Sequence, residues 1–88
     1  MTEFVAELYV PRSAAGLDRG AERARRAAEQ MTLEGTPVNL LRSIFLSEDE
    51  TCLLLYEAAS AEVVHEATRR AELQVDRVVE AFSQLEGG

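Results

Sequence analysis

The sequence predicts an α+β fold in which two helices cover one face of a four-stranded antiparallel sheet. Four segments show the apolar alternation or short apolar run that is typical of strands. Two other segments repeat apolar residues every three or four positions, as helices do. Within residues 38–60, two apolar segments flank a short acidic turn, which predicts a hairpin at the centre of the fold.

The first strand is expected over Thr2–Val10, and Pro11 should end it because proline cannot donate a ladder hydrogen bond. Alternating side chains of a strand point to opposite faces of a sheet. Phe4, Ala6, Leu8 and Val10 therefore share one face, and Val5, Glu7 and Tyr9 share the other.

A helix is expected over Leu17–Met31, because apolar residues recur there at spacings of four and three. Several of them are alanines, so the helix can lie close to the sheet. Gly35 and Pro37 mark its end and the following turn. The apolar stripe consists of Leu17, Ala21, Ala24, Ala28 and Met31.

The central hairpin is expected to pair Val38–Leu46 with Thr51–Tyr56 through a turn at Ser47–Glu50. Simple alternation puts Val38, Leu40, Arg42, Ile44 and Leu46 on one face, and Asn39, Leu41, Ser43 and Phe45 on the other. The second strand of the hairpin contains three successive leucines, which predicts that both of its faces are covered.

A second helix is expected to begin at Ser60, whose hydroxyl is a good N-cap, and the last strand is expected within Asp76–Leu85. Gly87 and Gly88 are expected to form a flexible tail. The apolar side of this helix consists of Val63, Val64, Ala67 and Ala71.

The order strand, helix, strand, strand, helix, strand predicts one ferredoxin-like βαββαβ domain over residues 1–86. Both helices then cover one sheet face and leave apolar residues on the other, which is unusual for a monomer. We therefore expect a two-fold homodimer, packed sheet to sheet in the manner of a dimeric α/β barrel. The interface residues expected are Val5, Tyr9, Leu41 and Phe45.

Composition limits the classes of partner. The net charge of −7 argues against nucleic acid, which needs a basic patch. No segment approaches the ~20 apolar residues of a membrane span, and no secretory leader is recognisable, which favours the cytoplasm. Cys52 lies in an apolar run and is expected to be a buried thiol. All basic residues are Arg, which suggests a bacterial genome of high GC content.

His65 is the single histidine, and Glu62 lies three residues earlier on the same side of the helix. An imidazole and a carboxylate could begin a site for a divalent metal of the nickel class, completed by water or a partner subunit. The alternative is an exposed His beside a carboxylate. The acidic turn at 47–50 lacks the alternating ligands and glycine of a calcium loop, and we expect it to be solvated.

Arg42, Tyr9 and Glu7 are polar or aromatic residues on predicted strands, and they could line a ligand pocket with Arg42 as the anion-binding group. The alternative is a structural ion pair between Arg42 and Glu7, Glu57 or Glu80. The serines lack the Gly-x-Ser-x-Gly context of a nucleophile, and no phosphate-cradling glycine loop is recognisable. We therefore assign no catalytic or cofactor-binding residue.

Two segments, Gly35–Ala58 and Ser60–Ala81, resemble a bacterial domain-of-unknown-function family of small ferredoxin-like proteins that includes a nickel-binding member. Arg42–Cys52 and Val75–Ala81 are the most specific parts of this resemblance. The resemblance implies a dimeric ferredoxin-like fold and metal binding. Some relatives carry a His where this chain has Ala67, whereas its own His lies two residues earlier.

Three hypotheses for function follow. The first is a non-enzymatic cytoplasmic homodimer that binds a small ligand such as nickel or another divalent metal. The second is a small enzyme of the dimeric α/β-barrel type, an oxygenase or isomerase, with an enclosed cavity between sheet and helices. The third is an interaction module whose sheet face meets a different protein.

Overall fold

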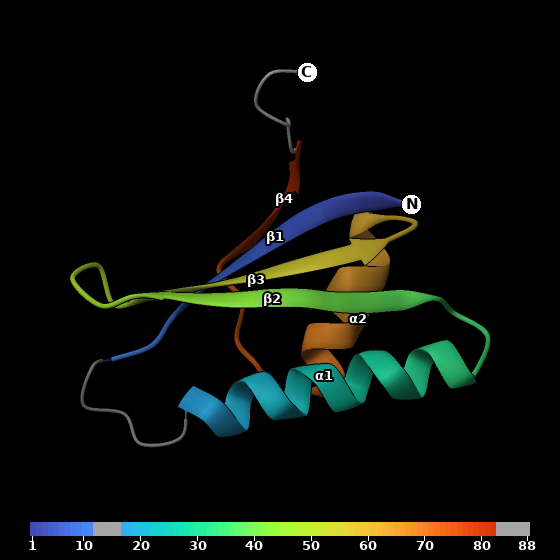
Figure 1. Ribbon diagram of the computed structural model, residues 1–88, viewed down its shortest axis with the longest axis horizontal. Helices are drawn as coiled ribbons and strands as arrows, with labels where there is room; N and C mark the ends of the chain where they lie inside the picture. The colour runs from blue at the N-terminus through green and yellow to red at the C-terminus, as the bar shows by residue number, and fades with distance from the viewer. Residues whose placement is uncertain (12–16, 83–88) are drawn as a thin grey trace.

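The computed structural model describes residues 1–11 and 17–82, apart from the side chains of 17 and 18. The expected tail at Gly87 and Gly88 and the side chain of Leu17 lie outside these residues. The elements follow the expected order (Figure 1). They are β1 (Thr2–Tyr9), α1 (Leu17–Leu33), β2 (Val38–Leu46), β3 (Thr51–Ala58), α2 (Ala61–Arg70) and β4 (Arg77–Ala81).

The strands form one antiparallel sheet in the order β2-β3-β1-β4. Figure 1 shows both helices on the same side of this sheet. Each helix connects two strands that have a third strand between them in the sheet: α1 links β1 to β2 across β3, and α2 links β3 to β4 across β1. The ferredoxin-like βαββαβ arrangement predicted from the sequence is therefore confirmed.

The core lies between the sheet and the helices, and alternation along the central strands supplies it. Cys52, Leu54, Tyr56 and Ala58 of β3 are all buried, as are Phe4, Ala6 and Leu8 of β1. The helices contribute mainly alanines, which lets their backbones approach the sheet, together with Met31 and Val64. The buried residues are Ala24, Ala27, Ala28 and Met31 of α1 and Val64, Ala67 and Ala71 of α2.

A β-bulge at Leu41 changes the faces of the second half of β2. Leu40 pairs with Tyr56, but the next pair joins Arg42 to Leu55, so Leu41 is an extra residue in the ladder. The simple alternation predicted for β2 is therefore wrong beyond Leu40. Arg42, Ile44 and Leu46 lie opposite residues of the helix-free face, whereas Ser43 and Phe45 lie opposite Leu54 and Cys52 on the helix side.

Both helices end in a Schellman motif. At α1 the amide of Thr36 donates to the carbonyl of Met31, and Gly35 takes the left-handed conformation with φ of 105°. At α2 the amide of Leu73 donates to the carbonyl of Thr68, and Glu72 takes the left-handed position with φ of 59°. Both turns bring the chain back to the sheet after each helix.

The N-terminus of α2 differs from the expectation in one respect. Ser60 occupies the N-cap position in an extended conformation, but its hydroxyl makes no capping hydrogen bond. The helix begins at Ala61 and is held by its buried face and by Arg23 of α1. The Nε of Arg23 donates to the carbonyl of Ala71, 2.9 Å away, at the other end of the helix.

Candidate functional site

The sheet face that carries no helix, which we call the open face, is the principal surface of this protein. The registers put apolar side chains of all four strands on it. Leu55, Val5 and Val79 form a row across β3, β1 and β4, and Leu53 and Ile44 lie beside it. Ile44 is 40% and Val79 is 38% exposed.

The expected interface residues are divided between the two faces. Val5 and Tyr9 lie on the open face, as predicted. Phe45 does not, because the bulge turns it to the helix side, where it packs against the core. Leu41 is the bulged residue and is 46% exposed. One or two leucines of the third strand were also expected on this face, and they are Leu53 and Leu55. The open-face residues that the sequence did not predict are Ile44, Leu46 and Val79.

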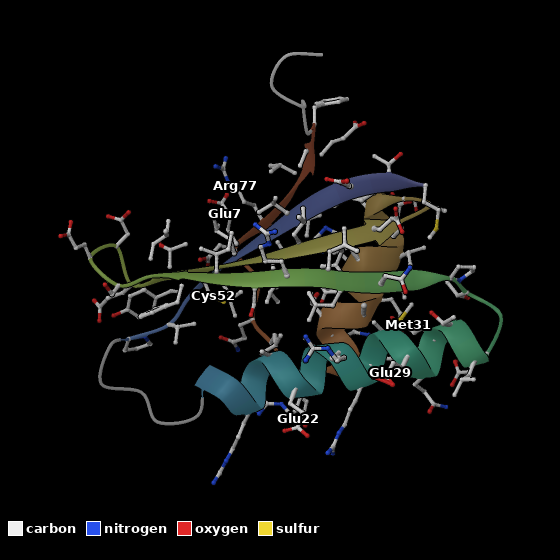
Figure 2. The ribbon with its side chains drawn as sticks, viewed as in Figure 1. Glu7, Glu22, Glu29, Met31, Cys52 and Arg77 are labelled. Atoms are coloured by element: carbon white, nitrogen blue, oxygen red, sulfur yellow. The ribbon has the colours of Figure 1, made fainter. Side chains whose placement is uncertain are left out.

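Charged and polar side chains surround this apolar centre. Arg77 of β4 donates to the carboxylate of Glu7 on β1, and Figure 2 shows the two side chains next to each other on the open side of the sheet. The hydroxyl of Tyr9 donates to Glu50 Oε1 at 3.4 Å. The open face therefore has an apolar centre and a polar rim, the anatomy of a protein interface.

The predicted ligand pocket of Arg42, Tyr9 and Glu7 is not assembled. All three lie on the open face, but Arg42 is on β2, with β3 between it and the β1 residues. Glu7 is paired with Arg77, and Tyr9 with Glu50. Four shallow hollows on the surface of the described residues are lined by other side chains.

The predicted alternative, an ion pair of Arg42 with Glu7, Glu57 or Glu80, is also absent among the residues that the structure describes. Arg42 is exposed, so its charge is solvated, and no residue of 1–11 or 17–82 pairs with it. Glu80 is out of reach because its register position, opposite Phe4, puts it on the helix side.

His65 and Glu62 both lie exposed on α2, as predicted. Within residues 1–11 and 17–82 no group of three or more His, Cys, Asp or Glu side chains comes together as a metal site would require. Glu66, the next acidic residue on α2, accepts hydrogen bonds from Arg69 and Arg70. These bonds lower the pKa of Glu66 to about 2, so its carboxylate stays ionised and bonded to the two arginines.

The helix side of the sheet holds two titratable groups that the site hypotheses did not use. Burial raises the pKa of Tyr56 to about 12, and its hydroxyl has no hydrogen-bond partner among the described residues. Burial also raises the pKa of the Cys52 thiol. A neutral, enclosed thiol is a poor nucleophile, in agreement with the sequence prediction of a structural cysteine.

Comparisons with known proteins support the fold alone. No protein-family model matches this sequence, and a search of curated proteins found no significant match. A similar solved structure is described as the crystal structure analysis of SCO4226 from Streptomyces coelicolor A3(2). It superposes with a TM-score of 0.68 at 19% identity, over 94% of this chain and 99% of that chain.

No helix within the described part of the chain is both long and apolar enough to cross a membrane.

Proposed function

We propose that this protein is a small homodimeric binding protein whose subunits pack open face against open face. The observation that carries the proposal is the continuous apolar centre of that face, with a charged rim. Four strands of five to nine residues, spaced ~4.8 Å apart, cover about 500 Å² in plan. That is comparable to one partner's share of a stable interface, about 800 Å² of accessible surface.

The geometry also supports the two-fold character of this assembly. Sheets that stack face to face bury alternate side chains of both layers. In a two-fold dimer the same surface of both subunits is used, so neither open face remains exposed. The second hypothesis, an enzyme with an enclosed cavity, receives less support. The helix side is filled by core residues, and the three residues of the predicted pocket lie on the opposite face.

Light scattering tests the dimer with a matched pair of variants. We expect twice the 9.7 kDa mass of the chain for the wild type. Leu55→Glu puts a charge at the centre of the open face and should give a folded monomer. Leu33→Glu is the control, because Leu33 is 84% exposed at the end of α1, and it should remain dimeric. A folded wild-type monomer would contradict the proposal and favour a different protein as partner.

As the ligand we propose a divalent metal such as nickel, bound at His65 and Glu62 in the cytoplasm. These side chains lie one turn apart on the exposed side of α2. In a dimer joined by the open faces, α2 points away from the partner. The remaining coordination positions must therefore be filled by water, and the affinity should be modest.

Calorimetry with nickel chloride tests this ligand. The dimer should release or absorb heat at about one nickel ion per chain, and His65→Ala should abolish the signal. Glu29→Ala, which removes an exposed carboxylate from α1, is the control and should bind as the wild type does. The metal proposal fails if the wild type gives only the heat of dilution, and the assignment to His65 fails if the variant binds normally.

A further inference from the structure

The open face carries a cation, Arg42, whose charge is unmatched among the residues that the structure describes. Arg42 is exposed and makes no hydrogen bond or ion pair with any residue of 1–11 or 17–82. The other open-face arginine, Arg77, is bonded to Glu7. In residues 17–82 several further arginines are also engaged, with Glu22, Glu66 and Glu34 as their partners.

The same face carries a carboxylate, Glu57, that makes no ion pair with the residues that the structure describes. Glu57 of β3 lies directly opposite Glu3 of β1, so two like charges occupy neighbouring positions. On its other side Glu57 faces Asn39, whose amide donates to Glu57 Oε1 at 3.4 Å. A neutral amide does not offset the charge, and Glu57 is half-buried against the sheet. A cation delivered from outside the subunit would stabilise this end of the face.

The positions of Arg42 and Glu57 suit a two-fold interface. Arg42 lies opposite Leu55, and Glu57 follows two residues later on the same face, so the charges are diagonal neighbours on adjacent strands. In an isologous interface the axis lies between the two stacked sheets. A two-fold axis that places Arg42 over Glu57 of the partner subunit runs obliquely to the strands, midway between the positions of Arg42 and Glu57 in one subunit. This axis crosses the open face close to Leu55 and Val5. Those apolar residues then pack against their own copies.

We propose that a second copy of this chain is recognised through reciprocal Arg42–Glu57 ion pairs, two per dimer, on either side of an apolar centre at Leu55 and Val5. This inference rests on the dimer proposed above and adds its register. The apolar centre supplies non-directional attraction, whereas the paired charges select one orientation and disfavour other apolar partners. The bulge at Leu41 is essential to this arrangement, because it is what puts Arg42 on the open face.

Charge-reversal variants test the register. Arg42→Glu and Glu57→Arg should each replace both ion pairs by pairs of like charges. Each variant should raise the dissociation constant of the homodimer roughly tenfold per contact, about a hundredfold in all. Mixing the two variants restores opposite charges at both contacts, so the mixture should form a heterodimer with nearly wild-type affinity. Arg25→Glu makes the same charge change on α1, where Arg25 lies exposed, and should leave dimerisation unchanged.

The readout is the dimer dissociation constant from native mass spectrometry, with one variant carrying an isotope label, and circular dichroism checks that each variant is folded. The mixture is decisive, because an ion pair within one subunit cannot be restored by mixing. A dimeric wild type whose variants dimerise normally, or whose mixture stays monomeric, overturns the register and leaves the dimer intact. A folded wild-type monomer overturns the dimer itself.

Discussion

Tyr56 is the residue whose chemical environment is least matched to its side chain. It lies in the middle of the core at 0% exposure, and its hydroxyl finds no partner among the described residues. A buried hydroxyl without a hydrogen bond costs about 1–3 kcal/mol relative to water. The ring is nevertheless retained at the centre of β3, where it fills the space under the slim helices.

We expect Tyr56→Phe to raise the free energy of unfolding by about 1 kcal/mol, because the ring stays and only the unpaired hydroxyl is lost. Urea unfolding at neutral pH measures this. A loss of stability would show that the hydroxyl is in fact bonded.

The same variant should change how the free energy of unfolding depends on pH in the alkaline range. The pKa of Tyr56 is raised from 10.0 to about 12 in the folded protein. The neutral phenol is therefore favoured by folding, so its contribution is present below pH 10 and is lost as the pH rises from 10 to 12. Absorbance at 295 nm should show one tyrosine that ionises near pH 12, and this step should disappear in Tyr56→Phe.

At this scale the sequence predicted exposure better than it predicted contacts. His65 and Glu62 are exposed as expected because helical periodicity places them opposite the apolar side. The burial of Tyr56 was not predicted, although its alternation with Cys52 and Leu54 could have indicated it. The partners of Glu7 and Tyr9 come from distant segments, Arg77 and Glu50, and no local pattern encodes such pairs.

The bulge in β2 shows why an element can be predicted correctly and still face the wrong way. Its bounds, Val38–Leu46, agree with the prediction. With or without a bulge at Leu41, β2 places apolar side chains on both faces of the sheet. Hydrophobicity alone therefore does not choose between the two registers. Arg42 decides between them, because a register without the bulge would turn an unpaired guanidinium into the core.

Two single-residue deletions separate these registers. Removing Leu41 leaves Leu40 opposite Tyr56 and Arg42 opposite Leu55 as consecutive pairs, so every face is kept. We expect this variant to lose less than about 1 kcal/mol of stability. Removing Ser43 instead forces either Arg42 or the three residues after it onto the opposite face.

We expect the Ser43 deletion to cost several kcal/mol and to leave the domain largely unfolded, because a buried unpaired charge or an exposed core side chain must result. Thermal unfolding by circular dichroism compares the two variants. Equal stability of both deletions would show that the register is set by something other than the face of Arg42.

At the scale of the molecule, the fold was predictable because the local patterns agree with one another. Periodicities of two and of three to four alternate along the chain in an order that one common topology satisfies. Ligand identity was not predictable in the same way, since the described residues bring no group of three or more His, Cys, Asp or Glu side chains together.

A dimer stabilised through the open face should unfold at a temperature that depends on protein concentration. Mass action favours the associated state, and a tenfold increase in concentration is worth about 1.4 kcal/mol, or a few degrees in the thermal midpoint. Differential scanning calorimetry between dilute and concentrated samples measures the shift. Leu55→Glu should show no such dependence, and a wild-type midpoint that does not move would argue against coupled folding and association.

The bulge has a second consequence, because β2 is an outer strand of the sheet. Stacking two subunits face to face hides side chains but leaves the free amides and carbonyls along this strand accessible. A regular row of such groups is a template on which a foreign strand can extend the ladder, the first step towards fibrous aggregates. The extra residue at Leu41 breaks the spacing of that row. One insertion thus orients the recognition surface and also discourages uncontrolled sideways growth.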